Sequence, residues 1–146
     1  MEYTVVPDIH ADLARLNWSI AQANGSKMIF LGDLIDAGKL VEKPDDLGIL
    51  QRVSQLIYND QASCILGNHE LNAILFHRRS SASNAPLRSH KEQNTKQHKS
   101  FIEAFGIESN DALFWTAWML ERLPLWLEFD GLRIAHACWS EKAIKI

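Results

Sequence analysis

The chain has 146 residues, of which 47% are hydrophobic and 23% are charged, and this composition excludes intrinsic disorder and collagen-like repeats. No run approaches the ~18 apolar residues that span a bilayer, and the sequence starts without the basic and then apolar segment of a secretory signal. The formal net charge of −3 argues against general nucleic-acid binding, and two cysteines cannot form a disulfide framework. We therefore expect a single cytoplasmic domain over residues 1–146 that has no membrane partner.

The first half of the sequence alternates short apolar runs with helical patterns, which is typical of parallel β-α-β units. Strands are expected at residues 3–7, 28–31 and 62–66. Apolar residues recur at helical spacing from Leu13 to Ala23, where Asp12 is the expected N-cap, and again from Leu47 to Ile57.

The pattern changes after the third expected strand. We expect helices at residues 70–76, 95–105 and 111–123, and an exposed loop at residues 77–94, which lack periodicity. Strands at residues 125–129 and 132–137 flank Asp130-Gly131, a pair that suits a type I′ hairpin turn because both positions favour positive φ.

Polar residues of the types that bind metal ions come directly after several of the expected strands. These segments read Asp8-Ile9-His10, Gly32-Asp33-Leu34-Ile35-Asp36 and Gly67-Asn68-His69-Glu70, and His136 follows a later strand. The carboxyl ends of parallel strands share one edge of a sheet, so these side chains are expected to converge. Imidazoles and carboxylates suit Mn, Fe, Zn or Ni, and a shared carboxylate can bridge two ions. Gly32 and Gly67 are expected to let the backbone turn sharply and approach the site closely.

These motifs together resemble the calcineurin-like metallophosphoesterase superfamily over essentially the whole chain. The longer runs at residues 67–74, 89–98 and 123–139 resemble a bacterial subgroup described as similar to protein phosphatases or diadenosine tetraphosphatases. The resemblance implies an α/β fold that is part of a four-layer α-β-β-α sandwich. It also implies that the C-terminal part of the second sheet is missing.

The resemblance further implies roles for individual residues. Asp8, His10 and Asp33 would hold a first metal ion, with Asp33 bridging to a second ion bound by Asn68 and His136. His69 would be the general acid, held by Asp36, while Asn68 and Lys39 would contact the substrate. Glu70 is expected to be a scaffold residue. The implied cofactors are two divalent ions, with Mn²⁺ favoured and Fe, Zn or Ni as alternatives.

The implied activity is hydrolysis of a phosphomonoester or a dinucleoside polyphosphate by water that two metal ions activate. Partners would be a phosphorylated small molecule, a nucleotide or a phosphoprotein, and sheet edges exposed by truncation could support an oligomer. The alternative is a truncated, catalytically weak or dead remnant that acts as a metal-binding, phosphate-binding or interaction module.

Three departures from the family pattern bear on this choice. The family's Asp-Arg-Gly motif is Asp36-Ala37-Gly38 here, so a bidentate guanidinium is absent and Lys39 could substitute only as a point charge. Ala11 stands where the family has glycine, which is expected to remove the freedom for positive φ. A further metal-binding histidine, expected beyond His136, is missing. Its conceivable replacements are expected in or near the exposed loop: His77, His90 and His98.

The segment from residue 78 to 99 carries six basic residues and one acidic residue, in a chain whose net charge is −3. It could form a basic flap that attracts a phosphorylated substrate, or it could be an ordinary solvated surface.

Overall fold

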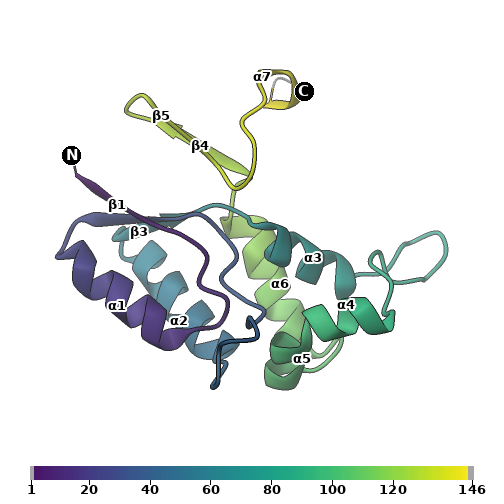
Figure 1. The fold of residues 1–146 in the computed structure, drawn as a ribbon. Helices are drawn as coiled ribbons and strands as arrows, with labels where there is room; N and C mark the ends of the chain where they lie inside the picture. Colours follow the sequence, from purple (N-terminus) through teal and green to yellow (C-terminus); the bar gives the residue numbers. More distant parts are fainter. Residues whose placement is uncertain (1, 145–146) are drawn as a thin grey trace.

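The structure is a computed structural model and describes residues 2–144. Its first sheet is parallel, in the order β1 (Tyr3–Val6), β2 (Lys27–Phe30) and β3 (Ala62–Cys64). Two helices connect these strands, α1 (Leu13–Ala23) and α2 (Asp46–Tyr58), and both lie on the same face of the sheet (Figure 1). The predicted β-α-β arrangement is therefore confirmed, and the carboxyl ends of its three strands share one edge.

Local signals in the sequence start the two connecting helices. The side chain of Asp12 caps α1 by accepting the N–H of Arg15 at 3.0 Å, and Asp45 caps α2 by accepting the N–H of Gly48 at 2.8 Å. Each helix then buries one face against the sheet. The core residues on these faces include Leu16 of α1 and Ile49, Leu50 and Val53 of α2, all fully buried.

Four further helices extend beyond the third strand. They are α3 (Asn68–Phe76), α4 (Glu92–Gln97), α5 (Lys99–Phe105) and α6 (Asn110–Arg122). The prediction of one helix over residues 95–105 is wrong, because His98 ends α4 and starts α5 with φ −101° and ψ 16°. The break accompanies a tertiary contact: the buried His98 side chain reaches Asp36, 62 residues away, at 2.7 Å.

The expected exposed loop at residues 77–94 is correct only in its middle. His77 is buried, Arg79 and Pro86 form an antiparallel bridge, and Glu92 already belongs to α4. Most residues between 81 and 91 are exposed, as the polar composition predicts.

A hairpin of β4 (Trp126–Phe129) and β5 (Leu132–Ala135) follows α6, and α7 (Glu141–Ile144) comes after it. The turn between the strands is as predicted, with φ of +50° at Asp130 and +77° at Gly131. The hairpin lies on the opposite side of the parallel sheet from α1 and α2 (Figure 1). Hydrogen bonds connect it to the first sheet, from Leu66 N–H to Pro124 O at 2.8 Å and from the Tyr3 hydroxyl to Asp130 at 3.0 Å.

This arrangement of a helical layer, a parallel sheet and a second, antiparallel strand pair confirms the predicted α/β class. Among residues 2–144, every helix is too short or too polar to cross a membrane.

Candidate metal centre and active site

Two loops that follow neighbouring strands cross at the centre of the site. Gly32 follows β2 with φ +92°, and a Cβ atom built on it would lie 2.5 Å from the backbone nitrogen of Gly67. A Cβ on Gly67 would in turn collide with the Asp33 side chain and backbone. Glycine is therefore needed at position 32 both for the positive φ and for the close approach of the two loops. At position 67 it is needed for the close approach alone.

Glu70 fixes the loop that carries Asp33. Its carboxylate is fully buried and accepts the N–H groups of Asp33, Leu34 and Gly67 at 2.8, 2.7 and 3.0 Å. Burial raises the pKa of Glu70, and the neighbouring Asp33 carboxylate raises it further. These contacts are those expected of a scaffold residue.

Several site residues adopt the left-handed backbone conformation. The φ angles are +49° at His10, +56° at Ala11, +52° at Asp33 and +63° at Asp36. The expectation that Ala11 gives up positive φ is wrong. Its backbone is held in that conformation because its N–H donates to Leu34 O at 2.8 Å and its carbonyl accepts from Asp45 N–H at 2.9 Å.

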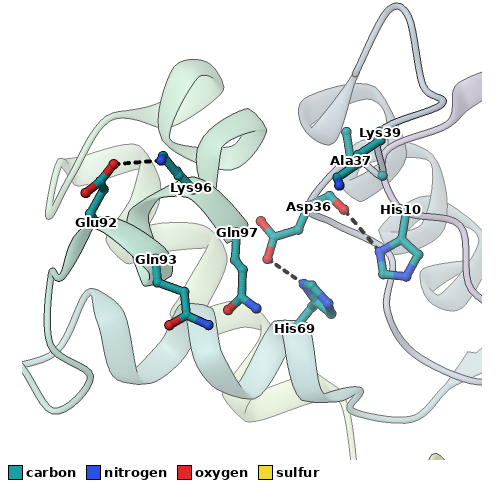
Figure 2. Close-up of a pocket in the computed structure, with 10 residues that line it drawn as sticks. His10, Asp36, Ala37, Lys39, His69, Glu92, Gln93, Lys96 and Gln97 are labelled. Atoms are coloured by element: carbon teal, nitrogen blue, oxygen red, sulfur yellow. Dashed lines mark hydrogen bonds and ion pairs between the residues drawn. The ribbon is translucent and has the colours of Figure 1, made fainter.

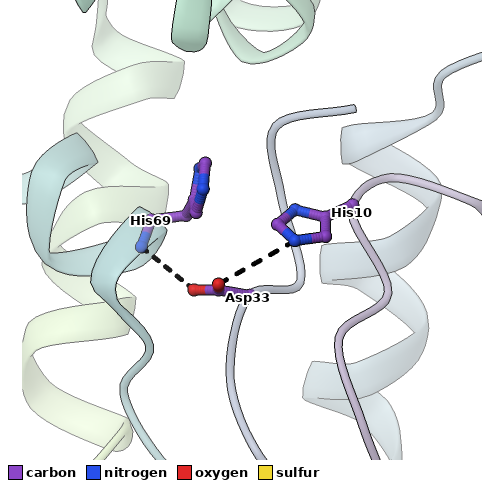
Figure 3. Close-up of side chains that lie close together, drawn as sticks. All are labelled: His10, Asp33 and His69. Carbon is purple, nitrogen blue, oxygen red and sulfur yellow. Dashed lines mark hydrogen bonds and ion pairs between the residues drawn. The ribbon is translucent and has the colours of Figure 1, made fainter. Parts of the chain in front are cut away.

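His10, Asp33 and His69 form a first group of converging donor atoms, each within 4.8 Å of the others (Figure 3). His10 Nδ1 lies 3.1 Å from two backbone carbonyl oxygens, of Ile35 and Asp36. Carbonyl oxygens only accept hydrogen bonds, so Nδ1 carries a proton and Nε2 is the ring nitrogen that faces the site. That Nε2 lies 3.9 Å from Asp33 Oδ2 and 3.6 Å from Asp8 Oδ2.

Asp8, Asp33 and His136 form a second group of the same kind. His136 Nδ1 donates to Leu31 O at 2.6 Å, and its Nε2 faces Asp33 Oδ2 at 3.5 Å. The Asn68 Oδ1 atom lies 2.9 Å from the same Nε2, so Asn68 joins this group. The structure thus brings together the five predicted metal ligands.

The donor set fits divalent metal ions. The Nε2 atoms of His10 and His136 lie 3.9 and 3.5 Å from Asp33 Oδ2, and imidazole nitrogens beside a carboxylate oxygen are ligands that suit Mn, Fe, Zn or Ni. Asp33 takes part in both groups, as a bridging carboxylate would. Asp8 approaches His10 and also belongs to the second group, so its assignment to the first ion alone stays a prediction.

His69 and Asp36 form the predicted carboxylate–imidazole pair, with Nδ1 and Oδ2 2.8 Å apart. The hydrogen bond to Asp36 raises the pKa of His69 and outweighs the opposing effect of burial. Burial raises the pKa of Asp36, but hydrogen bonds from His69 and His98 outweigh it and hold the pKa below its usual value. Asp33 adds a further constraint by accepting the His69 backbone N–H at 3.1 Å.

Comparison with protein-family profiles matches residues 1–142 to the calcineurin-like phosphoesterases. The chain belongs to the calcineurin-like phosphoesterase family. The family's activity is metal-dependent phosphoester hydrolysis, and its members typically use two metal ions. Comparison with curated proteins finds no match.

In this calcineurin-like phosphoesterase, a pocket of about 630 Å³ lies beside the His69–Asp36 pair (Figure 2). Lys39 lies on its lining, as the sequence predicts for a substrate contact. The other wall is formed by residues of the segment considered above as a basic flap or an ordinary solvated surface, all of them in α4: Glu92, Gln93, Lys96 and Gln97. The basic character of residues 78–99 was the available signal, and Lys96 pairs with Glu92 at 2.6 Å.

The three histidines considered as replacement metal ligands lie elsewhere in this phosphoesterase. In the part of the chain that the structure describes, neither of the two groups of side chains that could hold a metal ion includes His77, His90 or His98. The placement of His77 in an exposed loop is wrong, because its side chain is buried and contacts the buried side chain of His98. His90 stacks on Phe76 and bonds to its carbonyl oxygen at 2.8 Å.

Proposed function

We propose that the chain hydrolyses a phosphomonoester, or the phosphate chain of a dinucleoside polyphosphate, with the help of two Mn²⁺ ions. This is the substrate class of the bacterial subgroup that its longer motifs resemble. The proposal rests on one observation. The His69–Asp36 pair lies directly beside Asp33, the carboxylate that belongs to both groups of possible metal-binding atoms.

Each side chain has a defined task in this reaction. Asp8, His10, Asp33, Asn68 and His136 would hold the metal ions. Two bound divalent ions lower the pKa of water and neutralise the charge that builds on the phosphate oxygens. Asp33 also orients His69, because its Oδ1 accepts the His69 backbone N–H.

His69 would deliver the proton to the leaving oxygen. Its Nδ1 hydrogen is committed to Asp36, so Nε2 is the ring atom that is available to a substrate. The raised pKa keeps a larger fraction of His69 protonated near neutral pH than an isolated histidine would have, and a general acid needs that proton.

The pocket offers cations rather than a guanidinium fork to the phosphate. Lys39 comes from the loop after Asp36, and Lys96 comes from α4 on the other side, where its ammonium group pairs with Glu92 (Figure 2). Ammonium groups attract the phosphate by charge without imposing bidentate geometry. The pocket volume lies within the range of small-molecule sites, which leaves room for a leaving group beyond the phosphate itself.

The direct test uses metal-stripped protein that is reloaded with Mn²⁺. We expect turnover of p-nitrophenyl phosphate or diadenosine tetraphosphate that depends on the metal, and a loss of about 10²–10⁴-fold in kcat for His69→Asn on phenyl phosphate, whose poor leaving group needs the general acid. Mn²⁺ binding should survive that substitution. Lack of turnover of both substrates with each of Mn²⁺, Fe²⁺, Zn²⁺ and Ni²⁺ would refute the proposal.

One observation favours the alternative, a binding module with weak or no turnover. Asn68 and about half of the Asp8 side chain are exposed, so the second group of donors is open to solvent. Calorimetric titration with Mn²⁺ separates the two functions. Two tight sites support the enzyme, whereas one weak site supports the module.

A further inference from the structure

A buried chain of hydrogen bonds extends behind Asp36, away from the pocket. Asp36 Oδ1 is 2.7 Å from His98 Nδ1, and His98 Nε2 is 3.0 Å from His77 Nε2. The chain ends at the backbone, where the Glu108 N–H donates to His77 Nδ1 at 3.0 Å. Asp36 thus has a histidine on each carboxylate oxygen, with His69 on Oδ2 and His98 on Oδ1.

The backbone end of this chain decides where every proton lies. The Glu108 N–H can only donate, so His77 Nδ1 accepts and the proton of neutral His77 is on Nε2. His77 Nε2–H then donates to His98 Nε2, which leaves the His98 proton on Nδ1. His98 Nδ1–H in turn donates to Asp36 Oδ1. All donors therefore point toward Asp36.

The surroundings hold both histidine rings in place. His77 is 2% exposed and His98 is 4% exposed, and the His98 ring stacks on Phe101 with ring centroids 4.5 Å apart. Burial, with His98 and His90 nearby, lowers the pKa of His77 to about 4. A second proton on His98 would place two N–H groups face to face, because His77 Nε2 already carries one.

We propose that His98, oriented by His77, is a positioning residue that locks the Asp36 carboxylate so that His69 presents its Nε2 proton to the leaving group. A carboxylate with both oxygens engaged cannot rotate, and no free oxygen remains that could draw the His69 ring into another orientation. This inference rests on the proposed function, in which His69 is the general acid.

The test compares two isosteric substitutions of one buried residue. His98→Asn keeps an amide N–H near the position of Nδ1, whereas His98→Gln keeps one near Nε2 and loses the donor to Asp36. His90→Asn is the control, since His90 lies outside the chain of hydrogen bonds. Each variant is assayed with Mn²⁺ on phenyl phosphate, a poor leaving group, and on p-nitrophenyl phosphate, a good one.

A positioned general acid matters most for the poor leaving group. We expect His98→Gln to lose about 10-fold or more in kcat on phenyl phosphate and less than about 3-fold on p-nitrophenyl phosphate. His98→Asn should recover most of the loss. An equal loss for both substrates, or for both variants, would overturn the inference while wild-type turnover still supports the phosphoesterase. A wild-type protein without turnover would instead refute the proposed function.

A spectroscopic measurement needs neither a variant nor turnover. Long-range ¹H–¹⁵N spectra of the wild-type protein should show His98 protonated on Nδ1 alone and His77 protonated on Nε2 alone at neutral pH. A proton on His98 Nε2 would reverse the direction of the hydrogen-bond chain and overturn the inference.

Discussion

The buried carboxylate of Glu70 holds Asp33 by its backbone, accepting the Asp33 N–H at 2.8 Å. The same carboxylate accepts N–H groups from Leu34 and Gly67, so one side chain connects the loops after β2 and β3. The position of the proposed bridging ligand therefore depends on a residue that is not itself expected to bind metal.

Glu70→Gln should test this dependence. The substituted amide has one acceptor atom, so its NH₂ group would face a backbone donor and leave buried N–H groups unpaired. We expect a loss of about 2–3 kcal/mol in the free energy of unfolding, measured with denaturant, together with weaker Mn²⁺ binding. Glu103→Gln, at an exposed pair with Lys99, is the control and should leave both quantities nearly unchanged.

Asp33 and Asp8 should differ in the number of metal ions they affect. Asp33 belongs to both groups of donor atoms, so Asp33→Asn is expected to weaken binding of both Mn²⁺ ions by at least about 10-fold. Asp8→Asn should weaken the second group more strongly than the first. Electron paramagnetic resonance of free Mn²⁺ during titration counts the sites, and an Asp33→Asn protein with two unaltered sites would contradict the assignment.

The lowered pKa of His77 predicts that the free energy of unfolding depends on pH. Its pKa is about 4 in the folded protein and 6.5 in the unfolded chain, so between these values the unfolded state binds more protons. The contribution of neutral His77 is present above pH 6.5 and is lost as the pH falls toward 4, by up to about 3 kcal/mol. The free energies of unfolding of the wild-type protein and of His77→Gln should therefore converge at low pH. If the free energies of unfolding of the two proteins instead changed in parallel with pH, His77 would not be responsible for the pH dependence.

Ala11 allows a test of the left-handed backbone. Ala11→Gly relieves about 1–2 kcal/mol of steric cost at φ +56° but loses a buried methyl group and adds freedom to the unfolded chain. We expect a net change within about 1 kcal/mol. Ala73→Gly makes the same chemical change at an equally buried helical position and should cost about 2 kcal/mol. Equal losses would show that Ala11 carries no strain.

Lys39 should affect substrate binding more than the chemical step. An exposed cation at the pocket contributes about 1 kcal/mol to attraction of a phosphate dianion, so Lys39→Ala is expected to raise KM about 5-fold at low salt. Added salt should reduce the difference, because exposed charges are screened. Lys43→Ala removes an exposed cation that lies outside the pocket, and a comparable rise in KM there would contradict a specific role for Lys39.

Local and periodic signals predicted the scaffold of the site. Apolar runs located the strands, Asp12 located the start of α1, and Asp130-Gly131 located the hairpin turn. These features depend on residues within a few positions of each other. The convergence of the first three metal-binding motifs also followed from the sequence, because parallel strands place their carboxyl ends at one edge, whereas His136 follows a strand of the separate antiparallel pair.

What the sequence did not reveal depends on distant partners. Asp36 and His98 are 62 residues apart, and no spacing rule connects them. The positive φ of Ala11 follows from hydrogen bonds to Leu34 and Asp45 rather than from its own preference. Lys96 and Gln97 line the pocket from helix α4, which ends at His98, a break that the residue pattern did not predict.

The link between His136 and Leu31, which spans 105 residues, also sets an order of events during synthesis. Domains made on the ribosome begin to fold from the N-terminus. Of the five residues proposed to hold the metal ions, all but His136 have been made once residue 68 has been added, whereas His136 is made last and reaches the site only when the hairpin has docked. In the proposed assignment, the first metal site would therefore be complete before the second during synthesis.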